Sequence, residues 1–213
     1  MARLIFQKTL KTASEKGIIP ESSRKAVRWF RRKARGIRTS PRDILSEQER
    51  WKRTTLKRQL LGNMYFFIYD PVGKDTLPYW DTFPIVIPIE LTNDGFIGIN
   101  FHYLDPRFRA ILMDRLNELE RDEPDLMDKS EQSQSGKLDW RKIRYRRLSN
   151  LTRYKYFRPC LKRYKFKNIQ SRLIQVEKPE WDIALFLPLE KFQNRSGRSP
   201  GLTRIWNDSK NAF

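Results

Sequence analysis

The chain has almost none of the residues from which proteins build disulfides and zinc sites. Among 213 residues there is one cysteine, Cys160, and one histidine, His102. A single cysteine excludes an intrachain disulfide, and the two residues together are too few for a zinc site of histidine and cysteine. This composition fits a reducing compartment. Arg158 and Lys162 flank Cys160 and can lower the pKa of a thiol, but nothing else nearby indicates thiol chemistry, so we interpret Cys160 as structural.

Long hydrophobic runs are also missing. The longest nearly unbroken apolar stretch, Phe83 to Ile89, is far shorter than the ~20 residues that a membrane-spanning helix needs. The first residues, MARLIFQKTLK, lack the apolar core of a secretory signal. We therefore expect a soluble protein without a membrane span, not exported by that route, and we expect no cofactor.

Acidic residues are scarce outside the centre of the chain. Residues 1–62 carry 18 basic and 5 acidic side chains, residues 63–136 carry 6 and 14, and residues 137–213 carry 20 and 6. The formal net charge of +19 therefore comes from two basic flanks around an acidic middle. Charge of this size repels itself unless a polyanion or an acidic protein surface offsets it, so nucleic acid is the first partner to consider.

Residues 63–104 are the one stretch dense enough in apolar and β-favouring residues to nucleate a core. The runs in it are short, rich in β-branched and aromatic residues, and bounded by turn residues, which is typical of strands. A fourth run of this kind follows much later in the chain. The predicted strands are Tyr65–Tyr69, Phe83–Leu91, Phe96–Phe101 and Arg172–Val176.

The second and third of these strands should form a hairpin. Residues 92–95, TNDG, are of the types that tolerate the positive φ of tight turns. Pro84 and Pro88 cannot donate hydrogen bonds to a neighbouring strand. The second run is therefore predicted to be an edge strand, a bulged strand or an extended segment.

Helices are predicted on both sides of this stretch by capping residues and apolar spacing. Residues 122–136 are polar and acidic, which is typical of an exposed linker, and residues 194–213 read as a polar, extended tail. The predicted helices span residues 22–37, 41–61, 105–121, 137–158 and 179–187.

Together these elements predict an α+β fold: a small antiparallel sheet of three or four strands wrapped by helices, with basic extended termini. We divide the single domain into five parts. They are a basic helical arm (1–62), the central sheet with its covering helix (63–121), an acidic linker (122–136), a basic helical segment with the last strand (137–193) and a polar tail (194–213).

The first predicted helix has one apolar and one basic side. Six basic residues without an acid form a continuous stripe, which favours contact with nucleic-acid phosphates, the alternative being an acidic protein surface. A second candidate site lies where basic and aromatic residues interleave after residue 137. The candidate binding residues are Arg24, Lys25, Arg28, Arg31, Arg32 and Arg35 in the first group and Lys142, Arg146, Arg153, Lys162, Arg163 and Lys165 in the second.

Aromatic residues beside these cations could stack on bases of single strands or frayed ends. Interleaved aromatics are more often part of a core, and we favour that interpretation. The residues concerned are Tyr145, Tyr156, Tyr164 and Phe166.

No catalytic site is evident. A lone histidine without a nucleophile or a second histidine is more often packed and hydrogen-bonded than catalytic, and we expect this of His102. Four carboxylates near the strands could in principle bind Mg²⁺ as in a nuclease, but no lysine follows any of them by two residues. These are Asp70, Asp81, Glu90 and Asp94. We therefore predict neither a metal site nor an enzyme.

Several strings in the chain resemble a protein family of contractile-tailed phages, the DNA end protectors, which complete the head. The strings are MYFFIYDP from residue 64, LPYWDTFP from 77, GINFHYL from 98, LKRY from 161 and EWDIALFLPLEKF from 180. The resemblance covers about residues 60–193. It implies a virion protein made in the host cytoplasm and bound at the packaged DNA terminus or the head-to-tail joint.

The leading hypothesis is therefore a non-catalytic phage virion protein that binds DNA ends or the phosphate backbone at head completion. The alternative is a structural neck, tail or baseplate protein whose basic flanks dock onto acidic subunits of the neck, portal, tail or baseplate. The family brings no catalytic motif to these positions.

Overall fold

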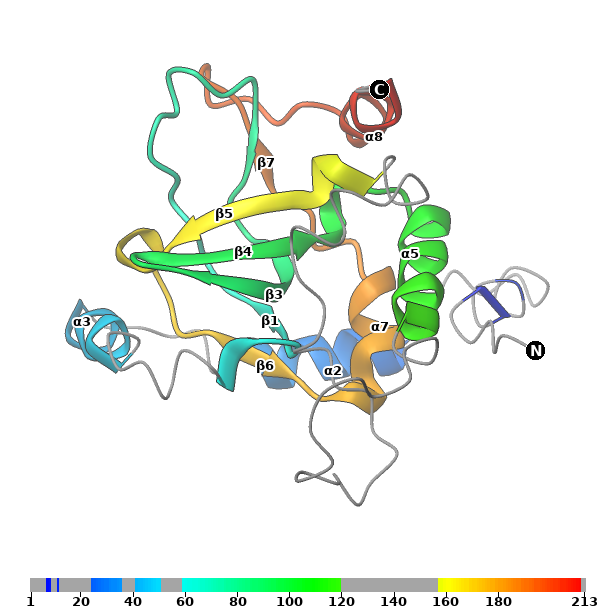
Figure 1. Cartoon of the computed structure of the whole chain (residues 1–213), viewed down its shortest axis with the longest axis horizontal. Coiled ribbons are helices and arrows are strands. Elements are labelled where there is room, and N and C mark those ends of the chain that lie inside the picture. Colours follow the sequence, from blue (N-terminus) through cyan, green and yellow to red (C-terminus); the bar gives the residue numbers. More distant parts are fainter. Residues whose placement is uncertain are drawn as a thin grey trace.

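A computed structural model describes residues 7–8, 11, 24–35, 41–50, 59–119 and 157–211 of the chain. It confirms the predicted α+β class (Figure 1). The main helices are α2 (Arg24–Ala34), α3 (Pro41–Arg50), α5 (Pro106–Leu119), α7 (Trp181–Phe186) and α8 (Leu202–Asn211). The strands are β1 (Met64–Phe66), β2 (Trp80–Asp81), β3 (Ile85–Thr92), β4 (Gly95–Asn100), β5 (Leu161–Lys165), β6 (Ile174–Val176) and β7 (Phe192–Gln193). Short 3-10 helices are η3 (Phe101–Tyr103), η6 (Phe166–Asn168) and η7 (Lys178–Glu180).

The main sheet has more strands than the three or four predicted. Five antiparallel strands follow the order β5-β4-β3-β1-β6, and β2 pairs with β7 in a separate two-stranded sheet. The added edge strand β5 lies in the segment that we expected to be basic and helical. The basic residues made this strand hard to recognise in the sequence. Side chains alternate between the two sides of β5, so Tyr164 is buried against the sheet while the side chains before and after it stay more accessible.

The proline-containing strand β3 is central, so the interpretation as an edge strand was wrong. It pairs with β4 on one side and with β1 on the other. The predicted bulge is confirmed, since the register against β4 shifts between Pro88 and Glu90. Pairing with β1 involves only Ile85 and Val86, so Pro88 lies beyond that ladder and no hydrogen bond to β1 is lost there.

The β3–β4 hairpin is confirmed, but Gly95 has a role other than the positive φ that we expected. Among the glycines that the structure describes, positive φ angles occur at Gly62, Gly73 and Gly197. A Cβ atom on Gly95 would lie 1.8 Å from the carbonyl oxygen of Tyr164. Glycine at this position therefore allows β5 to approach the end of the hairpin.

The two faces of the main sheet carry separate cores. Along β1, Met64 and Phe66 belong to a large core into which α2, α5, α7 and α8 send apolar side chains. Tyr65 and Phe67 point to the other face and belong to a smaller, mainly aromatic core with Tyr164. We call these the helical face and the aromatic face. None of the helices in the described ranges is long and apolar enough to cross a membrane.

Helix α8 occupies part of the tail that we predicted to be extended. Three residues at helical spacing hold it, because Ile205 is fully buried while Leu202 and Trp206 pack against the same core. The Trp206 indole N–H also donates a hydrogen bond to the His102 carbonyl oxygen (3.1 Å). The other residues of α8 are mostly polar, so the helical spacing of these three apolar residues was not recognised in the sequence.

Some of the remaining predicted helices and strands are confirmed, and others lie outside the described residues. Helices at α2, α5 and α7 and strands at β1, β4 and β6 are confirmed, although β1 ends at Phe66 and Tyr69 makes only a single bridge to Ile169. The predicted linker at 122–136 and helix at 137–158 lie outside the described residues, except for Phe157 and Arg158 in a 3-10 turn.

A serine at position 95 should weaken the sheet. In the Gly95→Ser variant the Cβ atom collides with the backbone of β5, and overpacking of this kind costs about 1–3 kcal/mol in the free energy of unfolding. The matched control is Gly201→Ser, because no atom lies within 4 Å of a Cβ atom there and serine favours the start of a helix. Urea unfolding of both variants measures the difference, and equal midpoints would contradict this account of Gly95.

Candidate nucleic-acid interface

Helix α2 is fixed to the helical face by two aromatic residues. The Trp29 side chain is almost fully buried, and its ring centroid lies 6.3 Å from that of Phe66. Phe30 packs edge-on against Phe83 with ring centroids 6.2 Å apart. Trp29 was not recognised in the sequence as an anchor of this helix. The anchoring holds the opposite side of α2 in a defined direction.

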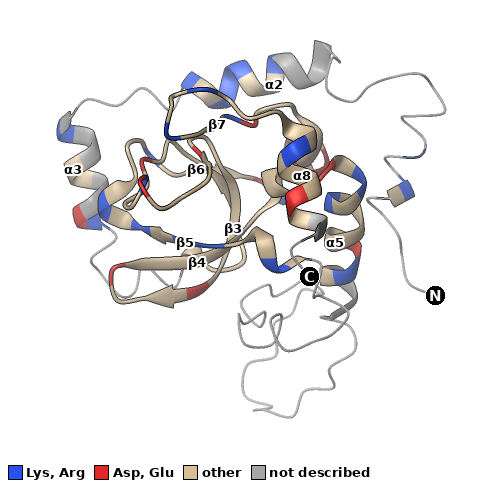
Figure 2. Cartoon of the chain, turned by 90° about the horizontal axis from the view of Figure 1, so that it is seen from above, with Lys and Arg blue, Asp and Glu red and all other residues tan. Residues whose placement is uncertain are grey.

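That opposite side carries exposed arginines. Arg28, Arg31, Arg32 and Arg35 are exposed and follow the spacing i, i+3, i+4, i+7 of one helix face. We call these four residues the arginine stripe, and Figure 2 shows the basic positions of α2 on the outside of the molecule. The other two predicted residues, Arg24 and Lys25, begin the same helix.

One acidic residue ties α2 to the rest of the fold. Glu180 pairs with Lys33 at 2.8 Å and with Arg32 at 3.2 Å. Lys33 also donates to the Gln175 carbonyl oxygen (3.2 Å), which links α2 to β6. The Arg32 side chain remains 70% exposed, so this pairing leaves it accessible to a ligand. Arg31 and Arg35 pair with none of the described carboxylates.

The predicted residues of the second group point in different directions. Arg163 and Lys165 lie on one side of β5, and both pair with Asp94, at 2.9 and 3.3 Å. Hydrogen bonding from Arg163 is the main cause that lowers the pKa of Asp94 to about 2. Lys162 and Tyr164 point to the other side, as alternation along a strand requires.

The structure does not bring the two predicted groups together. The arginine stripe belongs to a helix on the helical face, whereas Lys162 points to the aromatic face. Three residues of the second group, Lys142, Arg146 and Arg153, lie outside the described residues. Tyr164 and Phe166 are buried in the aromatic core, which confirms the interpretation of them as core residues, while Tyr145 and Tyr156 are not described.

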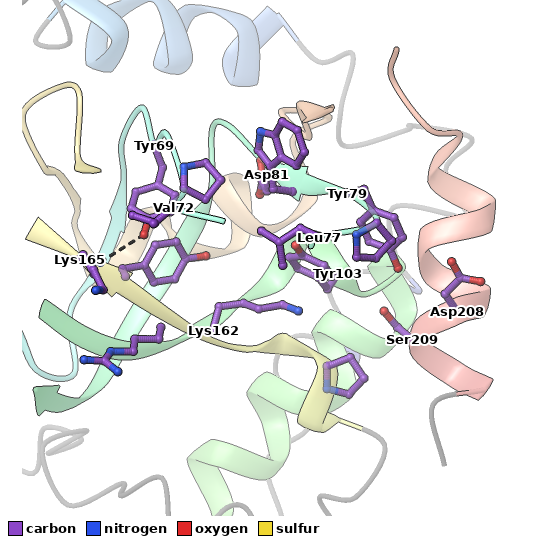
Figure 3. Close-up of a pocket in the computed structure, with 16 residues that line it drawn as sticks. Tyr69, Val72, Leu77, Tyr79, Asp81, Tyr103, Lys162, Lys165, Asp208 and Ser209 are labelled. Atoms are coloured by element: carbon purple, nitrogen blue, oxygen red, sulfur yellow. Dashed lines mark hydrogen bonds between the residues drawn. The ribbon is translucent and has the colours of Figure 1, made fainter. Parts of the chain in front are cut away.

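A pocket of about 410 Å³ opens beside β5 on the aromatic face (Figure 3). The Lys162 ammonium lies in it, 4.0 Å from the centre of the Tyr103 ring, and burial lowers the pKa of this lysine. Five aromatic residues contribute to the walls. They are Tyr69, Tyr79, Trp80, Tyr103 and Tyr164. Sequence reasoning missed this pocket, because about 80 residues separate Trp80 from Lys162.

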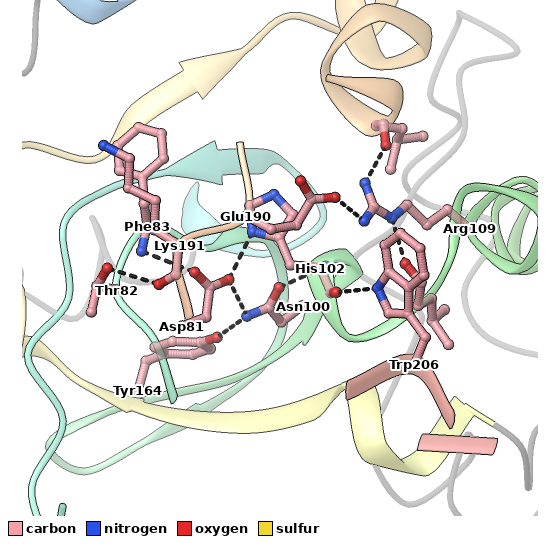
Figure 4. A network of polar contacts seen from close by, with 12 residues as sticks. Asp81, Thr82, Phe83, Asn100, His102, Arg109, Tyr164, Glu190, Lys191 and Trp206 are labelled. Atoms are coloured by element: carbon pink, nitrogen blue, oxygen red, sulfur yellow. Dashed lines mark hydrogen bonds and ion pairs between the residues drawn. The ribbon is translucent and has the colours of Figure 1, made fainter. Parts of the chain in front are cut away.

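Behind the pocket, the buried carboxylate of Asp81 organises a polar network (Figure 4). Its Oδ1 accepts from the Phe83 backbone N–H (3.0 Å), and its Oδ2 accepts from Asn100 Nδ2 (3.1 Å) and contacts His102 Nδ1 (2.8 Å). Asn100 Nδ2 also donates to the Tyr164 hydroxyl (3.0 Å). His102 is fully buried, as expected for a packed, hydrogen-bonded histidine.

Three of the four carboxylates that could have formed a metal site serve other contacts. Asp81 belongs to the network, Asp94 pairs with β5, and Asp70 pairs with Lys74. No group of three or more potential metal ligands occurs in the described parts of the chain. Cys160 is buried, and burial raises the pKa of its thiol to about 12, which outweighs the neighbouring cations and fits a structural role.

Comparison with known protein families gives a match. A family model described as phage T4 terminal DNA protecting protein matches residues 6–209. The chain belongs to this family. The match includes α2, both sheets and most of α8, and it confirms the resemblance to DNA end protectors. No curated protein and no solved structure matches the chain.

Replacing Asp81 tests whether its carboxylate is structural. The Asp81→Ala variant leaves buried donors of Asn100 and His102 without their acceptor, and each unsatisfied group costs about 1–3 kcal/mol. We expect a clear loss of stability in thermal or urea unfolding. The control is Asp75→Ala at an exposed loop position, where the change should stay within about 0.5 kcal/mol. Equal stability of the two variants would contradict a structural role for Asp81.

Proposed function

We propose that the protein is a non-catalytic phage virion component, made in the host cell, that binds the ends of packaged DNA through phosphate contacts. The observation that carries this proposal is the arginine stripe on α2, in a chain of the terminal DNA protecting family. Aromatic anchoring aims the stripe outward. Arginine suits phosphate recognition, since its planar guanidinium donates in pairs to phosphate oxygens.

The spacing of the stripe fits a polyanion with regularly repeated charges. Arg28, Arg31 and Arg35 span about two turns of helix, a length of roughly 10 Å. Duplex DNA carries a phosphate about every 3.4 Å along each strand, so a helix of this length can contact two or three of them. Such contacts position a protein on DNA without reading base sequence.

A digestion experiment tests end binding directly. Linear duplex DNA incubated with the protein should resist an exonuclease that degrades from ends, because a bound protein blocks the terminus. An excess of circular competitor DNA should leave the protection largely intact, while an equal mass of short linear fragments should remove it. If circular and linear competitors remove protection equally well, the protein does not select ends and the proposed function is wrong in that respect.

The salt dependence of binding tests the arginine stripe. Each phosphate contact contributes about −0.9 to the slope of log affinity against log salt concentration. Replacing Arg28, Arg31 and Arg35 together by alanine should therefore flatten the slope by roughly three and weaken binding to all sequences alike. Fluorescence anisotropy between about 50 and 200 mM salt measures both effects.

The matched control removes three exposed arginines from the C-terminal part of the chain. Arg195, Arg198 and Arg204 are exposed, so their replacement by alanine lowers the net charge equally. This control should change the slope less than the α2 variant. An unchanged slope in the α2 variant would instead favour the alternative, in which α2 docks onto an acidic virion subunit.

A further inference from the structure

The pocket on the aromatic face has an apolar rim that the fold leaves uncovered. Val72 is 57% exposed although it is a large aliphatic residue, and Leu77 and Pro78 line the same opening. The volume of about 410 Å³ lies in the range of roughly 300–1,000 Å³ that is typical of pockets for small ligands. The rim and the aromatic walls favour a flat, largely apolar group such as a nucleobase.

Of the three basic residues that line this pocket, Lys162 alone lacks a counter-charge among the described residues, since Arg163 and Lys165 pair with Asp94. The Lys162 side chain makes no hydrogen bond or ion pair with any residue that the structure describes, and its ammonium lies over the face of the Tyr103 ring. Burial works against the charged form of this lysine, as the lowered pKa shows. An anionic ligand group beside the ammonium would offset that cost.

The acidic groups at the pocket cannot supply this counter-charge and instead orient a ligand. Asp81 already contacts three groups in its network. Asp208, on α8, pairs with Arg204 (3.9 Å) and lies on the α8 side of the pocket (Figure 3). Burial, followed by the nearby Asp208 carboxylate, raises the pKa of Tyr79 to about 12, so its hydroxyl stays protonated. A phosphate is therefore repelled near α8 and attracted near β5.

We infer that this pocket holds the unpaired terminal nucleotide of a DNA strand, with the base between the Val72 rim and Tyr79 and the phosphate at Lys162. The inference rests on the proposed function and adds a basis for choosing ends over internal DNA. A base pair within a duplex does not fit such a pocket, whereas a frayed or overhanging nucleotide leaves the stack at little cost.

The position of β5 suits a strand that passes from duplex to pocket. β5 is an edge strand of the main sheet, so Lys162 and its neighbours Arg163 and Lys165 lie at the border between the helical and aromatic faces. Unpaired nucleotides that cross this edge would pass Arg163 and Lys165 and bring the end of the strand to the pocket. Blunt duplexes lack such nucleotides, and circular duplexes lack ends altogether.

Binding measurements on the full chain test the inference. The probes are a duplex with an eight-nucleotide overhang, the same duplex with blunt ends, and a circular duplex. The Lys162→Met variant keeps a side chain of similar length over Tyr103 and removes the charge. It should bind the overhang probe about tenfold more weakly than the unmodified protein does, with little change for the circle. The matched control is Lys191→Met, since Lys191 also lies over an aromatic ring, 5.6 Å from the centre of Phe83, but outside the pocket.

Photochemical crosslinking locates the terminal nucleotide. A 4-thiothymine base at the last position of the overhang should crosslink to peptides from residues 69–80 or 159–165, and the same base in the paired region should not. A Val72→Asp variant, which places a negative charge on the exposed rim, should reduce this crosslink, while Val72→Thr should preserve it. Both substitutions are at an exposed position, so folding should survive.

Each result decides between distinct outcomes. If Lys162→Met binds the overhang probe as tightly as the unmodified protein, or the terminal base crosslinks elsewhere, the pocket assignment is wrong, and binding through α2 is unaffected. If thymidine monophosphate occupies the pocket but the DNA end does not crosslink there, the site is one for free nucleotides and the inference is also wrong. Failure of the unmodified protein to bind any DNA overturns the proposed function and this inference together.

Discussion

The buried carboxylate of Asp81 links several elements around one end of the main sheet. Burying a charge is costly unless hydrogen bonds satisfy it, and three groups from the chain around it meet this requirement. Through Asn100 and His102 the carboxylate holds the end of β4 and the start of η3, and through Asn100 it reaches the Tyr164 hydroxyl on β5. The short β2–β7 sheet is thereby attached to the main sheet. Asp81 is used in these contacts, and Lys162 in the adjacent pocket pairs with none of the carboxylates that the structure describes.

The two faces of the main sheet have different cores, and this explains how one small domain can have an exposed row of arginines on one side and an aromatic pocket on the other. On the helical face, the aromatic residues of α2 pack into the core, and the arginines of the arginine stripe are exposed to solvent. On the aromatic face, β5 does the reverse with Lys162 and Tyr164, which point inward. Two side-chain periods produce this difference between α2 and β5: side chains alternate between the two sides of a strand, and they repeat every 3.6 residues around a helix. Contact with phosphates and contact with a base can therefore involve different elements of one chain.

Local patterns in the sequence predicted much of the fold but little of the pocket. The amphipathic spacing of α2 and the turn residues of the β3–β4 hairpin depend on neighbours within a few positions, so both could be predicted. β5 was missed because Lys162, Arg163 and Lys165 suggest a solvated helix, while the reason for a strand there, pairing with β4, lies about 65 residues away. Lys162 was grouped with its two basic neighbours by position, although alternation places it on the opposite side of the strand.

The acidic residues of the described chain help to explain how so basic a protein forms a compact core. Asp94 forms ion pairs with two basic residues of β5, and Glu180 forms ion pairs with two of α2. Glu190 pairs with the buried Arg109. Arg109 is fully enclosed and also donates to the Leu104 and Leu185 carbonyl oxygens (2.8 Å each), so its charge is satisfied within the protein. Acids placed in this way neutralise cations where elements meet, whereas outward-facing arginines such as Arg31 and Arg35 pair with none of the carboxylates in the described ranges. A net charge of +19 then acts mainly at the surface, where a polyanion can reach it.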